Sequence, residues 1–120
     1  MAFARRLLGS GISAQATNNI IGDVTQGATA LGANQATALV AITVGTEITS
    51  AASGTGILGL PGNPGDTQWV YNGNTGNAVL WYPPSTDTVN NAATSYSIPI
   101  NTGVLFIKRN STSWIAIKTA

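Results

Sequence analysis

Four acidic side chains could do acid–base chemistry, and each stands in a different segment: Asp23, Glu47, Asp66 and Asp87. Paired carboxylates act together only when they converge within about 5–10 Å, and nothing in this spacing favours convergence. Asp66 follows a Pro-Gly pair, so its side chain is expected to close a turn. The 120 residues include no His and no Cys, which removes the usual general base and the thiolate metal ligands. We therefore expect no catalytic residue, no cofactor, no metal site and no enzymatic activity.

Hydroxyl side chains are plentiful, but they stand in turn sequences. No Gly-x-Ser-x-Gly elbow is present, and no His could activate a serine. Gly54-Thr55-Gly56 lacks the Lys-Ser/Thr ending of a phosphate loop, so it is predicted to be a tight turn. Asn110-Ser111-Thr112 matches the N-glycosylation pattern, but the N-terminal residues do not resemble a secretory signal. We expect this tripeptide to form a hairpin turn.

Aromatic side chains offer a second kind of chemistry, because exposed rings on a β surface can stack against sugars. The aromatics in question are Trp69, Tyr71, Trp81, Tyr82, Tyr96 and Trp114. Alternating aromatics on strands are more often core or interface anchors. Both interpretations stay open, with packing favoured.

The composition narrows the classes of partner. Charged residues make up only 8% of the chain, and the net charge is +1, whereas an ordinary soluble domain has about 25% charged residues. So weak a field does not attract nucleic acid. No segment approaches the ~20 apolar residues of a membrane helix. We expect neither a nucleic-acid partner nor a membrane partner, and assembly in a cytoplasm.

From residue 38 to residue 118 the sequence predicts a series of short strands separated by turn-forming residues. These strands must position the acidic, hydroxyl and aromatic side chains described above. Residues 69–71 and 79–82 flank an Asn/Gly-rich turn, and residues 104–108 and 114–117 flank a second turn. Such runs predict an all-β fold, namely a small antiparallel β-sandwich or barrel-like domain. We assign residues 36–120 to this β domain and residues 1–35 to an extended N-terminal arm.

The last two predicted strands are apolar on both faces. Leu105 and Ile107 share one face of their strand, while the other face holds Val104, Phe106 and Lys108. One face is expected to cover the core and the other a neighbouring subunit, since a monomer rarely exposes so much apolar surface. Our candidate subunit interface consists of Val104, Phe106 and Trp114.

The N-terminal arm combines apolar residues with two arginines. We predict that it binds in a groove of a partner protein through Phe3, Arg5, Arg6, Leu7, Leu8 and Ile12. Two charges neutralise too little of a polyanion to bind it well, which favours a protein partner. The alternatives are an unremarkable terminus and a first strand packed on its own domain.

A series of short motifs runs from residue 38 to residue 117: Ala38-Leu39, Thr46-Glu47-Ile48-Thr49, Ala51-Ala52-Ser53-Gly54-Thr55-Gly56, Leu60-Pro61, Gly65-Asp66, Asn72-Gly73-Asn74, Asn77-Ala78, Trp81-Tyr82-Pro83 and Trp114. In these motifs and their order the chain resembles small β domains of tailed-bacteriophage virion proteins. These motifs are mainly turn formers, and they cover about two thirds of the chain. The sequence departs from the pattern at Val89-Asn90-Asn91-Ala92.

The resemblance implies a virion structural protein of the capsid decoration (cement) or head-fibre type. The first expectation is a homotrimer on the outer surface of a capsid that binds the major capsid protein and stabilises the shell. The alternative is a fibre or receptor-binding module that recognises host surface glycans. The short chain favours the decoration protein, because a fibre needs a shaft or an attachment domain.

Overall fold

The computed structural model describes residues 23–91 and 93–119, and these residues form strands arranged in two sheets. The larger sheet has the order β1 (Val24–Ala30), β3 (Gly45–Ala51), β5 (Thr67–Asn72), β9 (Thr102–Lys108), β10 (Ser113–Lys118) and β7 (Thr88–Val89). The smaller sheet has the order β2 (Leu39–Val40), β4 (Gly56–Leu58), β6 (Val79–Tyr82) and β8 (Tyr96–Ile98). The expected all-β fold is confirmed.

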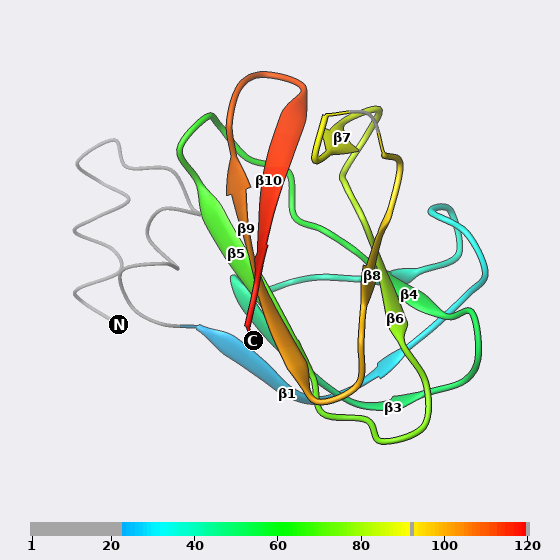
Figure 1. The fold of residues 1–120 in the computed structure, drawn as a ribbon. Helices are drawn as coiled ribbons and strands as arrows, with labels where there is room; N and C mark the ends of the chain where they lie inside the picture. The colour runs from blue at the N-terminus through cyan, green and yellow to red at the C-terminus, as the bar shows by residue number, and fades with distance from the viewer. Residues whose placement is uncertain (1–22, 92, 120) are drawn as a thin grey trace.

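The first six strands wind as a solenoid, because the chain alternates between the two sheets with every strand (Figure 1). Strands β1, β3 and β5 are parallel in the larger sheet, and β2, β4 and β6 are parallel in the smaller one. Val24 pairs with Gly45, and Gly45 pairs with Trp69, so successive coils are 45 − 24 = 21 and 69 − 45 = 24 residues long. Coils stacked in this way bury apolar side chains against those of the adjacent coils.

The last strands close the solenoid with antiparallel pairs. Strand β8 runs antiparallel to β6, β9 runs antiparallel to β5, and β10 pairs with β9 in the predicted second hairpin. In that hairpin Trp114 lies opposite Lys108 and Ile117 lies opposite Leu105. Of the eight ladders in the described residues, five are parallel and three antiparallel. The pairing thus differs in detail from an antiparallel sandwich.

The first predicted hairpin does not form, because β5 and β6 lie in different sheets. The buried side chain of Asn72 directs the chain out of β5: its Nδ2 donates to the carbonyls of Asn77 and Ile98, both at 3.1 Å. Its Oδ1 accepts the backbone N–H of Asn74 at 3.2 Å. These bonds substitute for the ladder that a hairpin would have formed.

The core lies between the two sheets and is built on aromatic rings. Trp81 stacks on Phe106 with ring centroids 3.8 Å apart, and Trp114 meets the edge of Trp81 at 5.6 Å. A Cβ at Gly59 would overlap the Trp81 ring, so this position requires glycine. The large rings of β6, β9 and β10 therefore bring the two sheets together.

This core corrects the predicted subunit interface. Val104, Phe106 and Trp114 are 2%, 0% and 1% exposed, respectively, and belong to the core of their own chain. The opposite face of the same strands, which holds Leu105 and Ile117, is the exposed one. Alternation could not decide between two apolar faces, and the bulky rings fit between the sheets.

The boundary of the N-terminal arm also moves. Residues 24–30, assigned to the arm from the sequence, form β1, which pairs along its length with β3. Ala30 is 2% exposed and belongs to the core. The alternative of a first strand packed on its own domain therefore holds for these residues.

Candidate interaction surface

Two of the acidic side chains, those of Asp66 and Asp87, have partners within the fold. Asp87 forms an ion pair with Lys108, its Oδ2 lying 3.0 Å from the Lys108 Nζ. Asp66 accepts the backbone N–H of Asn63 at 2.9 Å, as expected of a residue that closes a turn. Across residues 23–91 and 93–119, no three His, Cys, Asp or Glu side chains gather in a way that could hold a metal ion.

The ion pair is part of a buried network that holds the loop before β7. Asp87 and Lys108 have side chains only 9% exposed, and the Trp114 Nε1 also donates to the Asp87 Oδ2 at 3.0 Å. The Lys108 ammonium lies 5.6 Å from the Trp114 ring centroid. Each polar group in this network has a partner, which identifies it as structural.

Two of the polar motifs form turns, as predicted. In the first, the Thr55 hydroxyl and backbone N–H both donate to the Ala52 carbonyl, at 2.7 and 3.3 Å. In the second, the Asn110 Oδ1 accepts the backbone N–H of Thr112 at 3.0 Å and the Ser113 hydroxyl at 2.9 Å. The side chains of both motifs are engaged in shaping the backbone.

The main exposed apolar feature is one side of the larger sheet, which we call the outer face. It consists of the outward-pointing positions of three adjacent strands: Thr67, Trp69 and Tyr71 of β5, Gly103, Leu105 and Ile107 of β9, and Ile115 and Ile117 of β10. Trp69, Leu105 and Ile117 form one row, because Leu105 pairs with both of the others. Val24 of β1 lies at the far end of this row, beyond Gly45.

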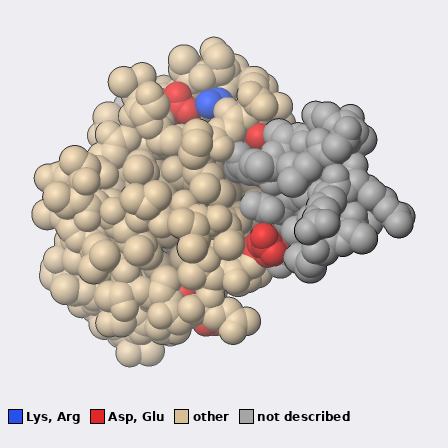
Figure 2. Space-filling model, turned by 180° about the vertical axis from the view of Figure 1, so that it is seen from behind, with Lys and Arg blue, Asp and Glu red and all other residues tan. Residues whose placement is uncertain are grey.

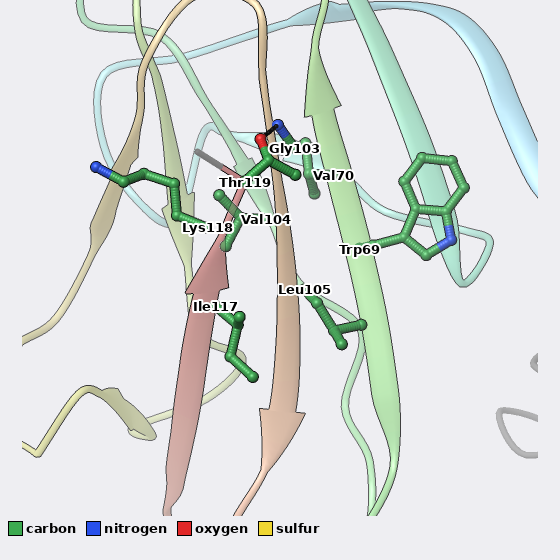
Figure 3. A pocket seen from close by; sticks show the side chains of 8 residues that line it. All are labelled: Trp69, Val70, Gly103, Val104, Leu105, Ile117, Lys118 and Thr119. Atoms are coloured by element: carbon green, nitrogen blue, oxygen red, sulfur yellow. Dashed lines mark hydrogen bonds between the residues drawn. The ribbon is translucent and has the colours of Figure 1, made fainter.

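A shallow hollow of about 390 Å³ crosses the outer face. Figure 3 shows the Leu105 and Ile117 side chains beside each other in it, while the Lys118 ammonium points away. The dashed line in Figure 3 joins the Gly103 N–H to the Thr119 Oγ1, at 3.1 Å. The remaining lining residues are Trp69, Val70 and Val104. The hollow offers apolar contact and few polar groups to orient a small ligand.

Trp69 extends the apolar surface toward β3. In Figure 3 its side chain points away from Leu105 and Ile117, and a Cβ at Gly45 would overlap its indole ring. The indole therefore lies over the backbone of Gly45, the residue paired with it on the neighbouring strand. This contact between Trp69 and Gly45 on the neighbouring strand was not predicted from the sequence.

The aromatic side chains divide between core and surface. Trp81 and Trp114 are buried, and Tyr96 packs edge-on against Phe106. Tyr71 is exposed on the outer face. Packing is confirmed for the core rings.

Charged groups are few on the visible surface. Figure 2 shows one side of the molecule, and few Lys, Arg, Asp or Glu atoms interrupt it. Within the residues that the structure describes, no helix is long and apolar enough to cross a membrane. The predicted partner-binding residues of the arm, Phe3 to Ile12, lie outside the described residues.

Comparisons with protein-family models, curated proteins and solved structures find no match to this chain.

Proposed function

We propose that this protein is a non-enzymatic virion structural protein of a tailed bacteriophage, namely a capsid decoration protein. It binds the outer surface of the head and stabilises it, with the major capsid protein and other copies of itself as partners. The resemblance of residues 38–117 to small phage β domains suggests the class. The observation that carries the proposal is the broad apolar outer face on a protein with only 8% charged residues.

The architecture supports a packing role. The polar network around Asp87 has its partners within the chain, and the turn motifs are occupied in shaping the backbone. The outer face, by contrast, presents Leu105, Ile115 and Ile117 with exposed fractions of 37%, 38% and 52%. Exposed apolar surface of this kind typically marks protein interaction sites.

A decoration protein acts by mass action. Because it binds the assembled shell and not the free capsid subunits, each bound copy lowers the free energy of the assembled state. Several arms attached to one oligomer hold it more tightly than a single arm, since each later binding event is intramolecular. A homotrimer is the oligomer that the resemblance suggests.

Co-sedimentation with undecorated capsids tests the proposal. Purified protein should pellet with capsids to a saturating level, and deletion of residues 1–20 should weaken this binding while leaving β1 intact. Exchange of Arg5 and Arg6 for glutamate should weaken it too, whereas Arg109→Glu, at the exposed turn after β9, is the matched control. Protein that stays in the supernatant at every concentration would refute the proposal.

One observation favours a second candidate, a fibre or receptor-binding module for host glycans. Tyr71 is 37% exposed on the outer face, and the partly exposed Trp69 lies two residues before it on the same face of β5. Such rings can stack against a sugar. Glycan-array binding that Tyr71→Ala abolishes, together with no binding to capsids, would support this candidate over the first.

A further inference from the structure

We propose that the outer face of the larger sheet is the surface on which this chain packs against a second copy of itself. The proposal rests on the self-association included in the proposed function and names the surface responsible. It replaces the face predicted from the sequence, whose residues Val104, Phe106 and Trp114 are buried in the core.

The first argument is the continuity of the apolar surface. Ile117 and Leu105 are directly paired across β10 and β9, and Ile115 and Ile107 form the next outward pair. Tyr71 on β5 extends the same face. Adjacent rows of aliphatic side chains on neighbouring strands form a surface that a second sheet can pack against, as in a sandwich.

The second argument is area. The three strands of the outer face, β5, β9 and β10, are hydrogen-bonded neighbours. Three strands about 4.8 Å apart, with six residues of about 3.3 Å each, give a projected area of roughly 300 Å². A standard protein interface buries about 800 Å² of accessible surface on each partner. The outer face therefore supplies the apolar centre of a modest, reversible interface, and the flanking residues of β1 and β3 add to its area.

The third argument is charge. None of the outward positions of β5, β9 and β10 holds a charged residue. Glu47 on β3 lies directly beside Tyr71 at the edge of the outer face, and Arg109 follows β9 at the opposite end of the strands. An uncharged centre can lie against an identical centre without like-charge repulsion, and depletion of charge is typical of interface cores. The same lack of charge gives a polyanion or a charged peptide nothing to bind.

Light scattering coupled to size exclusion tests the proposal on the full chain. The wild-type protein should elute as an oligomer of the 12.2 kDa chain. Measurements from about 1 to about 100 μM bracket the affinity of a modest interface. Ile117→Lys and Leu105→Lys each place a charge in the centre of the outer face and should raise the dissociation constant by at least about tenfold.

Ile42→Lys is the matched control. Ile42 is 72% exposed and lies between β2 and β3, outside the three strands of the outer face, so the same change there should leave the oligomer intact. Circular dichroism checks that each variant folds. Should a lysine variant fail to fold, Ile117→Thr keeps a β-branched residue in the strand, and it should still weaken association measurably.

Three results would overturn the proposal: a monomeric wild type over the whole range, Ile117→Lys and Leu105→Lys proteins that associate as tightly as the wild type, or equal weakening by Ile42→Lys. Co-sedimentation separates this test from the proposed function. If the protein forms oligomers that do not bind capsids, only the decoration role is refuted. If it is a monomer that binds capsids, only the proposed interface is refuted.

Discussion

The buried network of Asp87, Lys108 and Trp114 allows a sharp prediction about stability. In Asp87→Asn, the amide oxygen still accepts the Trp114 N–H, but the Lys108 ammonium loses its counter-charge. Both charged side chains are 9% exposed, with Nζ and Oδ2 3.0 Å apart. Breaking a buried ion pair costs about 3–5 kcal/mol, and we take about 3 kcal/mol because the ammonium keeps its contact with the Trp114 ring.

Comparing Asp87→Asn with Lys108→Met and with the double variant isolates the contribution of the ion pair to stability. Lys108→Met removes the cation beside the Asp87 carboxylate, which keeps its hydrogen bond from the Trp114 N–H. The free energy of unfolding should fall by a similar amount. The double variant buries no unpaired charge, so it should be about 2 kcal/mol more stable than the sum of the two single losses predicts. Lys118→Met, at an exposed position of the same sheet, should change stability by less than about 0.5 kcal/mol.

Urea unfolding followed by tryptophan fluorescence measures these differences. With a slope of about 1.5 kcal/mol per molar urea for a domain of this size, a loss of about 3 kcal/mol lowers the unfolding midpoint by about 2 M. Equal slopes for all variants establish that the comparison is between the same two states. The reasoning would be refuted by additive effects of the two changes, or by an Asp87→Asn protein as stable as the wild type.

Three further changes test close contacts elsewhere. Gly59→Ala should cost about 3 kcal/mol or more, because the added Cβ overlaps the ring of the buried Trp81, which has no room to move. Gly45→Ala should cost about 1 kcal/mol and shift tryptophan emission to longer wavelength, since the partly exposed Trp69 can swing into solvent; equal costs for the two glycines would contradict this difference. Asn72→Ala should cost about 3 kcal/mol by leaving backbone groups unpaired, with thermal unfolding as the measurement, and a change in melting temperature no larger than that of a surface variant would argue against the role of this side chain.

The solenoid repeat of the smaller sheet could not be predicted from the sequence. Leu39, Ile57 and Trp81 are paired in register across β2, β4 and β6, at intervals of 57 − 39 = 18 and 81 − 57 = 24 residues. These apolar residues recur once in every coil of the solenoid. Because the connecting loops differ in length, the sequence shows no constant spacing between them. The same turn formers that delimit hairpins also delimit coils, so they did not distinguish the two arrangements.

The sequence by itself determined the all-β class, the turns at Asp66, Thr55 and Asn110, and the final hairpin. Each depends on residues close together in the chain, where turn chemistry and alternation act directly. The tertiary structure alone decided that β5 and β6 separate into different sheets and that β1 belongs to the larger one. It also decided which apolar face of β9 and β10 is buried, because two apolar faces alternate identically and only the fit of Phe106 and Trp114 against Trp81 selects between them.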